Sequence, residues 1–308
     1  MHIEIRAVRS DEYSRAAELL FPEAVAMHGK MVERREFLRK LEAMGYDLSH
    51  AIVAVSDGRL VGVMMELPAP DGTVLVARPR LADPRAAEAG RIERELIAYC
   101  RDRARKRGRI YLQSLSTVED EATRAVFAEA GFTHGVTLLH LRLDPSRFPN
   151  DADAAPPPPE LAFTSYSDET HPRFAATIDR TYNGTRDCPN IPRVHDVDRV
   201  IETHKEAGRF DPALWRLASD ERGEFGVILI NEEPNRDCYD LVYMGVTPER
   251  RGEGLGRHVL EEGIRQVEVR RVRPIELAVD ETNAPAVRLY QRRGFEPVGR
   301  SVAMICKV

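Results

Sequence analysis

The fold is decided by the stretch Val246-Thr-Pro-Glu-Arg-Arg-Gly-Glu-Gly-Leu-Gly-Arg257, which joins a predicted strand to a predicted helix. Residues 240–246 have the apolar character of a strand, and residues 258–271 carry apolar side chains at helical spacing. The loop between them contains three glycines, Gly252, Gly254 and Gly256. These glycines leave backbone N–H groups uncovered at a helix N-terminus, where the helix dipole favours an anion. The stretch therefore predicts a cradle for a pyrophosphate.

Two other interpretations of this loop are a simple tight turn and a dinucleotide-binding fingerprint. The fingerprint needs glycines in the order Gly-x-Gly-x-x-Gly within a repeated parallel strand–helix–strand pattern. The loop has a different glycine spacing, and no such repeat follows it. A tight turn before the helix stays open as an alternative.

A second block of sequence supports the cradle. Residues 275–279 alternate like a strand, and residues 283–295 read Asn-Ala-Pro-Ala-Val-Arg-Leu-Tyr-Gln-Arg-Arg-Gly-Phe. Pro285 in the first turn and Gly294 at the end are typical of a short helix. Together with Arg251-x-x-Gly254-x-Gly256, this block resembles the acyl-CoA-binding region of the GNAT acyltransferase superfamily. The resemblance implies acetyl-CoA, or another acyl-CoA, as co-substrate.

The resemblance also implies a set of cofactor-binding residues: Met244, Val246, Arg251, Gly252, Glu253, Gly254, Leu255, Gly256, Arg257 and Asn283. In the GNAT family the strand that carries Met244 and Val246 bulges and splays from its neighbour, which frees backbone N–H groups for the thioester oxygen. We expect the N–H group of Val246 to lie nearest that oxygen. Asn283 binds the pantetheine arm, caps its own helix, or does both.

Acyl transfer to an amine requires a base for the amine and an acid for the departing thiolate. Tyr290 matches the tyrosine that is the acid in GNAT enzymes, and its alternative role is a core aromatic three residues after Val287. Asp240 lies where several relatives carry a carboxylate that accepts the amine proton. Its alternative is an ordinary surface carboxylate beside a strand.

The acceptor is expected to contact residues 180–212, because the connection between the first two helices of a GNAT domain lines the acceptor pocket. The first part of this segment is rich in turn-forming and polar side chains. Tyr182, Arg186 and Asp187 are candidate substrate contacts, or else parts of a structured turn. Cys188 has no evident base partner, so the sequence favours direct transfer over a covalent cysteine intermediate.

The chain has 308 residues, which is the length of two domains, and its halves resemble each other. A polar and then proline-rich segment between them is typical of an extended linker. We predict a degenerate GNAT-like domain over 1–147, a linker over 148–159 and an acyl-CoA-binding catalytic domain over 160–308. Each domain is expected to be a mixed, mostly antiparallel twisted sheet flanked by helices, an α/β fold of the α+β type.

The two halves differ at positions that carry the chemistry. Aligning them places Glu88 opposite Gly252, so that a carboxylate occupies the phosphate cradle of the first half. Phe127 falls opposite Tyr290, which removes the hydroxyl group. We expect the first half to bind acyl-CoA poorly or not at all.

Composition excludes several classes of partner. A net charge of −5 argues against nucleic acid as the main partner. No apolar run approaches the roughly 20 residues that cross a bilayer, and the N-terminus lacks the apolar core of a signal peptide, so we expect a cytoplasmic protein without a membrane partner. The cysteines, Cys100, Cys188, Cys238 and Cys306, lack the spacing of a metal site, and no metal is expected.

These features together predict an enzyme that moves an acetyl group from acetyl-CoA to a primary amine of a small molecule or peptide. The alternative is a non-catalytic protein that binds acyl-CoA as a sensed or regulatory ligand. Retention of Tyr290 beside the glycine loop favours the enzyme, because a sensor has no use for a thiolate acid.

Overall fold

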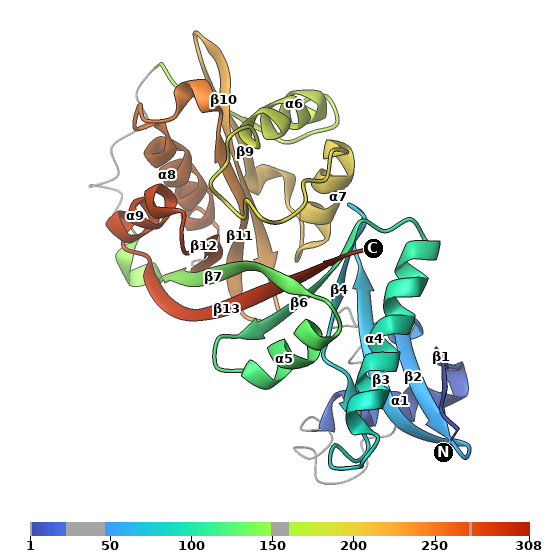
Figure 1. The fold of residues 1–308 in the computed structure, drawn as a ribbon. Coiled ribbons are helices and arrows are strands. Elements are labelled where there is room, and N and C mark those ends of the chain that lie inside the picture. The colour runs from blue at the N-terminus through green and yellow to red at the C-terminus, as the bar shows by residue number, and fades with distance from the viewer. Residues whose placement is uncertain (1, 23–46, 149–159, 271–272) are drawn as a thin grey trace. The chain divides into compact units, whose positions relative to one another are not determined.

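The computed structural model describes residues 2–22, 47–148, 160–270 and 273–308 (Figure 1). The chain divides into two compact units, one made of residues 1–135 with 302–308 and the other of residues 136–301. Each unit is a mixed, mostly antiparallel sheet flanked by helices. The predicted fold class is therefore confirmed.

The first unit contains the sheet order β1-β2-β3-β4-β6, with β5 paired to β3. Its pairs are antiparallel except for β4 with β6. The elements are β1 (Glu4–Ala7), η1 (Ser10–Glu12), α1 (Tyr13–Leu20), η2 (Leu48–His50), β2 (Ala51–Ser56), β3 (Arg59–Pro68), β4 (Thr73–Val76), β5 (Arg80–Leu81), α4 (Ala89–Lys106), β6 (Tyr111–Thr117) and α5 (Glu121–Glu129). Successive side chains of β2 and β3 point to opposite faces of the sheet. Ile52 and Met64 pack with α4 on one face, and Val53 and Val63 pack with α1 on the other.

The second unit contains the sheet order β7-β12-β11-β10-β9-β8, in which only β11 and β12 are parallel. Its elements are β7 (Thr133–Leu143), η3 (Pro145–Arg147), β8 (Ala162–Ser165), α6 (His171–Thr181), α7 (Val197–Glu206), η4 (Pro212–Leu214), β9 (Trp215–Asp220), β10 (Gly223–Glu233), β11 (Cys238–Val246), η5 (Pro248–Arg250), α8 (Leu255–Glu268), β12 (Ile275–Asp280), α9 (Ala284–Arg293) and β13 (Glu296–Lys307). Ile228 and Ile230 of β10 pack with α8, and Val227 and Leu229 pack with α6.

The units differ from the predicted domains at two strands, β7 and β13. Most of β7 belongs to the second unit, where it pairs with β12 and buries Leu141 and Leu143, although it precedes the predicted linker. The end of β13 belongs to the first unit, where Val302 and Met304 join the core. The two compact units therefore divide the chain differently from the predicted domains at these strands, because strand alternation does not reveal which core a strand completes. Residues 149–159 of the predicted linker lie outside the described residues.

Asn231 fastens α7 to the sheet of the second unit. The Asn231 side chain is fully buried on β10, and its amide donates to the carbonyl oxygens of His204 and Ala207, both at 2.6 Å. Its Oδ1 accepts a hydrogen bond of 2.9 Å from the indole nitrogen of Trp215. The end of α7 thus has partners for carbonyl groups that a helix leaves unsatisfied.

Replacing Asn231 with Leu is expected to lower the free energy of unfolding by about 3 kcal/mol or more, because three buried polar groups lose their partner. Urea unfolding followed by the fluorescence of Trp215, the one tryptophan of the chain, measures this loss. The exposed Asn235 offers a matched control, Asn235→Leu, which should change stability little. A loss in N231L no larger than in the control contradicts the fastening role.

Candidate active site

The central feature of the second unit is an opening between β11 and β12. These parallel strands pair at only two positions, Tyr239 with Ile275 and Asp240 with Glu276, although β11 continues to residue 246 and β12 to residue 280. Beyond Asp240, the edge of β11 on the β12 side therefore has no paired strand, while the other edge stays paired with β10. Among the described residues of the first unit, by contrast, all four residues of β4 pair with β6.

Backbone N–H groups of β11 point into this opening. The register between β10 and β11 shifts so that Val242 is an extra residue, which is a β-bulge. Thr247 donates its N–H to the carbonyl of Phe225 at 2.8 Å, and antiparallel pairs alternate between bonded and unbonded. The N–H groups of Met244 and Val246 therefore face away from β10. The splayed, bulged strand expected from the sequence is present.

The glycine loop has the backbone that a phosphate cradle requires. Gly252 and Gly254 have φ angles of +84° and +81°, a region that favours glycine. A Cβ atom at either position would meet no atom within 4 Å, so the space beside the loop is open. Gly254 lies directly before α8 and gives it no side-chain cap. Leu255 and Gly256 begin the helix, and a Cβ on Gly256 would lie 3.8 Å from the Met244 side chain.

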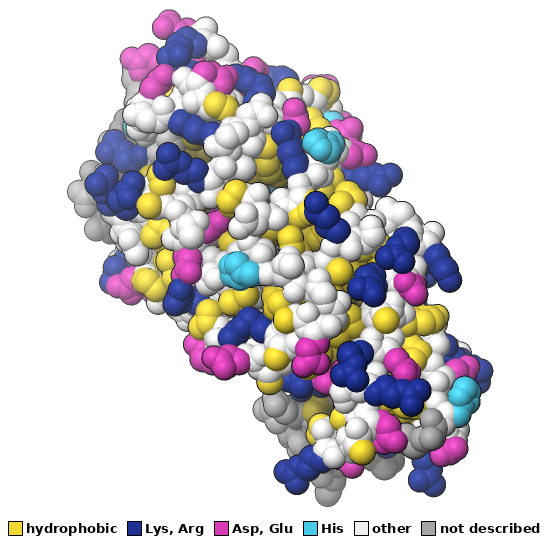
Figure 2. Space-filling view, in the orientation of Figure 1, with side chains coloured by type: hydrophobic (Ala, Val, Ile, Leu, Met, Phe, Trp, Pro, Cys, Tyr) yellow, Lys and Arg dark blue, Asp and Glu magenta, His cyan; other side chains and the backbone are white. Residues whose placement is uncertain are grey.

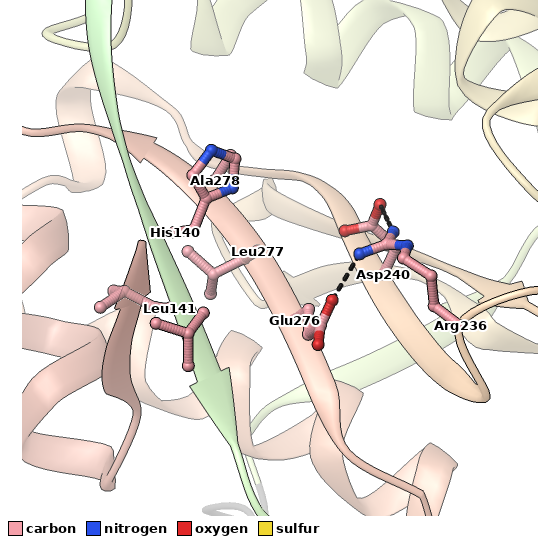
Figure 3. Close-up of a pocket in the computed structure, with 8 residues that line it drawn as sticks. His140, Leu141, Arg236, Asp240, Glu276, Leu277 and Ala278 are labelled. Carbon is pink, nitrogen blue, oxygen red and sulfur yellow. Dashed lines mark hydrogen bonds and ion pairs between the residues drawn. The ribbon is translucent and has the colours of Figure 1, made fainter. Parts of the chain in front are cut away.

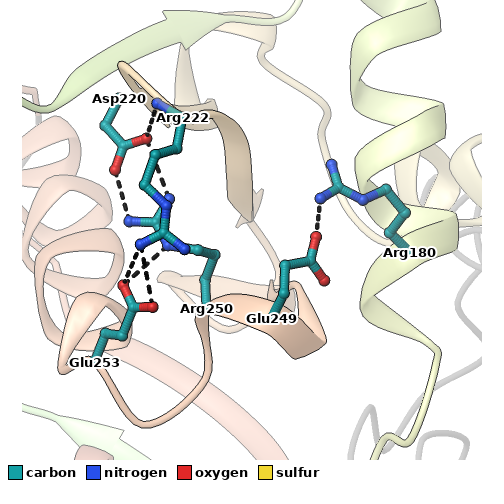
Figure 4. Close-up of polar contacts among 6 residues, drawn as sticks. All are labelled: Arg180, Asp220, Arg222, Glu249, Arg250 and Glu253. Atoms are coloured by element: carbon teal, nitrogen blue, oxygen red, sulfur yellow. Dashed lines mark hydrogen bonds and ion pairs between the residues drawn. The ribbon is translucent and has the colours of Figure 1, made fainter.

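The acidic side chains of the glycine loop are neutralised by arginines (Figure 4). Glu249 forms an ion pair with Arg180 of α6. Glu253 accepts a hydrogen bond of 2.9 Å from the Nε of Arg250 and lies 3.3 Å from Arg222. These pairs remove charge that would repel a phosphate. The Glu253 side chain is thus engaged within the protein, which leaves its backbone as the group available to a ligand.

Arg250 is the buried centre of this network, with a side chain only 7% exposed. Its guanidinium donates to both carboxylate oxygens of Asp220, at 3.1 and 2.6 Å, and the hydrogen bonds lower the pKa of Asp220. The bidentate pair ties the start of the loop to the end of β9. Sequence reasoning missed Arg250, because neighbouring arginines in a loop give no sign of which one turns inward.

Arg251 is oriented differently from the sequence expectation of a cofactor contact. Its Nε donates to the carbonyl of Val246 at 3.0 Å. Its terminal nitrogens donate to the carbonyls of Thr181, Asn183 and Gly184, at distances of 2.6, 2.9 and 2.9 Å. The Arg251 side chain therefore binds protein carbonyl groups. Arg257, one turn into α8, is exposed.

Tyr290 lies in the hydrophobic core of the second unit and is 7% exposed. Its ring packs edge-on against Phe295 at a centroid distance of 5.7 Å, as the core interpretation predicts. Burial raises the pKa of its hydroxyl, and the charge of Asp187 raises it further. The hydroxyl is therefore kept protonated, which is the state that an acid needs.

The end of the acceptor segment is anchored to the end of β12. Asp187 accepts a hydrogen bond of 3.2 Å from the backbone N–H of Asp280, and the Asp280 carboxylate accepts one of 3.1 Å from the N–H of Cys188. Desolvation raises the pKa of the Asp187 carboxyl and raises that of the Cys188 thiol to about 12. Cys188 is thus a poor nucleophile, in agreement with the sequence expectation.

Tyr182 and Arg186 complete the predicted substrate contacts. Tyr182 ends α6, and its ring lies 5.6 Å from that of Tyr243. Arg186 is exposed on the loop that follows. Asn283 caps α9 by accepting from the N–H of Ala286, so the capping interpretation of Asn283 holds in the structure.

Asp240 lies at the closed end of the opening and lines a pocket (Figure 3). The pocket residues come from four strands and a turn: His140, Leu141, Arg236, Asp240, Glu276, Leu277, Ala278 and Val298. Arg236 pairs with Asp240 at 3.1 Å and also with Glu276. Burial raises the pKa of Asp240, and the charge of Arg236 opposes this shift.

His140, Arg236 and Glu276 were not predicted as site residues. Glu276 lies opposite Asp240 in the register of β11 and β12, and His140 lies opposite Ala278 in the register of β7 and β12. No sequence pattern states these registers. Arg236 precedes Asp240 by four residues in a hairpin turn, so its pairing with Asp240 is the ion pair of this pocket that lies close in sequence.

Two features of the described residues bear on two other classes of protein, membrane-spanning proteins and metal-binding proteins. No helix among them is long and apolar enough to cross a membrane. Within the same residues, no cluster of three or more histidine, cysteine or acidic side chains could hold a metal ion. The visible face in Figure 2 mixes Lys and Arg with Asp and Glu.

Comparison with known proteins agrees with this geometry. Residues 179–295 match the model of the Acetyltransferase (GNAT) family. The chain is 29% identical over 234 residues to the mycothiol acetyltransferase of Clavibacter michiganensis subsp. michiganensis, covering 71% of this chain and 73% of that protein.

Two solved structures share the fold across nearly the whole chain. A GCN5-related N-acetyltransferase from Sphaerobacter thermophilus superposes with a TM-score of 0.66 at 20% identity, covering 99% of this chain and 95% of that chain. A tandem GNAT protein from the clavulanic acid biosynthesis pathway gives a TM-score of 0.61 at 19% identity, covering 99% and 98%.

The two units therefore have the fold of tandem GNAT proteins. Residues 179–295 of the second unit are thus similar in sequence to the GNAT acetyltransferases. GNAT acetyltransferases use acetyl-CoA as the acetyl donor, as the resemblance of the glycine loop implied.

Replacing Arg250 with Met is expected to lower the melting midpoint at pH 7 by roughly 5 °C, because Asp220 and Glu253 lose their shared cation. The lowered pKa of Asp220 makes this contribution full above the ordinary aspartate pKa of about 3.9, and it shrinks as the pH falls below that value. Thermal melts at pH 7, 5 and 3 measure the difference. The exposed Arg292 provides the control R292M, and a difference between wild type and R250M that grows towards pH 3 contradicts the assignment.

Proposed function

We propose that the second unit transfers an acetyl group from acetyl-CoA directly to a primary amine of a small molecule or peptide, at the opening between β11 and β12. The unpaired edge of β11 between Asp240 and the glycine loop is the observation that carries this proposal. It offers directed N–H groups along one line, beside a cradle with open space at its glycines. An acyl-CoA needs such a line for its arm and such a cradle for its pyrophosphate.

The cradle comprises the backbone N–H groups of residues 252–256 at the start of α8, since the N–H group of Arg257 donates to the carbonyl of Gly254. The helix dipole and the uncapped first turn supply the attraction for a pyrophosphate. Arg257 adds an exposed cation, and Glu253 contributes through its backbone because its side chain binds Arg250. The side chain of Arg251 binds carbonyl groups of the protein, and its backbone N–H group donates to the carbonyl of Pro248. Asn283 caps α9, and its contact with a pantetheine arm stays part of the proposal.

The direction of the arm follows from the position of the cradle. The loop continues directly from Val246, and Asp240 lies six residues back along β11, or roughly 20 Å at about 3.3 Å per residue. The pantetheine arm therefore runs from Val246 towards Asp240, and its acyl end lies deepest. We assign the N–H of Val246 to the arm and the N–H of Met244 to the thioester oxygen, which revises the sequence expectation that Val246 lies nearest. Such a donor is worth about 100-fold or more in rate.

Asp240 and Tyr290 are the proposed proton-transfer groups. Asp240 accepts the proton that the acceptor amine loses, directly or through a water in the adjoining pocket, and the charge of Arg236 beside it favours the ionised carboxylate. As the new amide bond forms and the bond between carbonyl carbon and sulfur breaks, Tyr290 gives its proton to the leaving thiolate. The position of Tyr290 supports this role, because it lies in the same core cluster against which Met244 of β11 packs, and a tyrosine hydroxyl carries its proton at neutral pH.

The acceptor is proposed to approach along residues 182–187, where Tyr182, Arg186 and Asp187 are the candidate contacts. The name of the similar Clavibacter protein connects its acetyl transfer with mycothiol. An amine related to mycothiol is therefore the first acceptor to test, together with amino sugars and peptides.

The first unit is proposed to bind acyl-CoA poorly or not at all. Its parallel strands β4 and β6 stay paired along the whole of β4, and Phe127, aligned with Tyr290, is fully buried in the core. Glu88, aligned with Gly252, stands directly before α4, where its charge would repel a phosphate.

Replacing Gly254 with Glu is expected to weaken binding of CoA and acetyl-CoA by more than about 100-fold, because a carboxylate enters the cradle and repels the pyrophosphate. Isothermal titration calorimetry measures both ligands. Gly58 has a φ angle of +71° and open space around it, like Gly254, so G58E is a control for the backbone strain. Equal affinity in G254E and G58E would remove the cradle from the proposal.

Replacing Tyr290 with Phe is expected to slow turnover about 100-fold without weakening CoA binding, because only the proton donor is lost. Release of free CoA thiol from acetyl-CoA in the presence of an amine panel measures turnover. Tyr239, buried in the same core, provides the control Y239F. Tight CoA binding with no thiol release for any amine in the wild-type protein would contradict catalysis and favour the acyl-CoA sensor.

A further inference from the structure

The loop of residues 181–188 bridges the two strands that form the opening. At one end, Thr181 packs tightly on β11. A Cβ atom on Gly245 would lie only 2.8 Å from the Thr181 side chain, so glycine is required there. The hydroxyl groups of Thr181 and Tyr243 are also 2.6 Å apart. At the other end, Asp187 and Cys188 exchange hydrogen bonds with Asp280 at the end of β12.

Arg251 fastens the first part of this loop. Its guanidinium makes four hydrogen bonds, three of them to carbonyls of residues 181–184 and one to the carbonyl of Val246 on β11. The three loop carbonyls lie at the C-terminus of α6, where carbonyl groups lack partners within the helix and the dipole favours a cation. Arg251 thus joins the α6 terminus to the strand that faces the opening.

The guanidinium of Arg251 has few free N–H groups with which to bind a phosphate. A guanidinium has five N–H groups, and the four bonds use four of them. Turning the side chain towards the cradle would strip Val246 and the α6 terminus of this donor. The neighbouring Arg250 is likewise committed, to Asp220 and Glu253.

We propose that Arg251 is a positioning residue, which holds the acceptor loop of residues 181–188 in register with the β11 edge and does not bind the pyrophosphate through its side chain. The inference rests on the proposed transfer at this opening. Because Val246 receives one Arg251 bond on its carbonyl and is assigned to the pantetheine arm on its N–H, the same strand residue links the acceptor loop with the bound co-substrate.

Hydrogen exchange measured by mass spectrometry tests this role without any acceptor. In Arg251→Met, amides of residues 181–190 are expected to exchange at least about tenfold faster than in wild type, because loss of charged hydrogen bonds favours local opening. Peptides from α8 and β10 should keep their protection, which distinguishes local opening from unfolding. Arg251→Lys retains one ammonium and should restore part of the protection.

The contrasting variant is Arg257→Met, which removes an exposed cation beside the cradle. It is expected to weaken CoA binding in calorimetry and to leave loop exchange unchanged, whereas R251M should change CoA affinity by less than about threefold. Unchanged loop exchange in R251M, or a tenfold loss of CoA affinity in R251M, overturns the positioning role. Absence of CoA binding to the wild-type protein would instead refute the proposed function, and the loop exchange would still report on Arg251.

Discussion

The short contact between β11 and β12 is the constraint on which the site depends. Two parallel residue pairs hold these strands together, and beyond Asp240 they separate. A sheet interior normally satisfies every backbone N–H and carbonyl group, so such a separation is costly unless other groups bind the freed edge. The Val246 carbonyl is bound by Arg251, and the N–H groups of Met244 and Val246 remain for a ligand. The bulge at Val242 re-aims the strand at this point.

The residues around the opening divide the work between backbone and side chain. Ligand-facing groups are mainly backbone N–H groups, on β11 and at the start of α8. Charged side chains mostly bind one another and thereby set the shape of the loops: Arg250 binds Asp220 and Glu253, and Arg180 binds Glu249. This arrangement lets a loop rich in both signs of charge present glycines and the exposed cation of Arg257 to an anion, with its carboxylates already paired.

The sequence predicted the glycine loop, the strand before it and the helix after it, because these depend on local periodicity and on the conformational freedom of glycine. The inequality of the two halves, inferred from Glu88 and Phe127, stays a prediction. The sequence did not predict the direction in which side chains point. Adjacent Arg250 and Arg251 look alike in a sequence, yet one turns to Asp220 and the other to the end of α6. The pocket around Asp240 was missed because it arises from strand register, as Glu276 and His140 come from distant segments.

The two shared strands have a consequence for how such a protein can evolve and be dissected. β7 begins in the first unit and completes the sheet of the second, while β13 begins in the second and completes the core of the first. A gene cut at the proline-rich segment would leave each fragment without one of its own strands, with an unpaired, aggregation-prone edge. Each unit thus takes one strand from the other side of the proline-rich segment, so the two halves are expected to be kept together in evolution and to fold poorly when expressed alone.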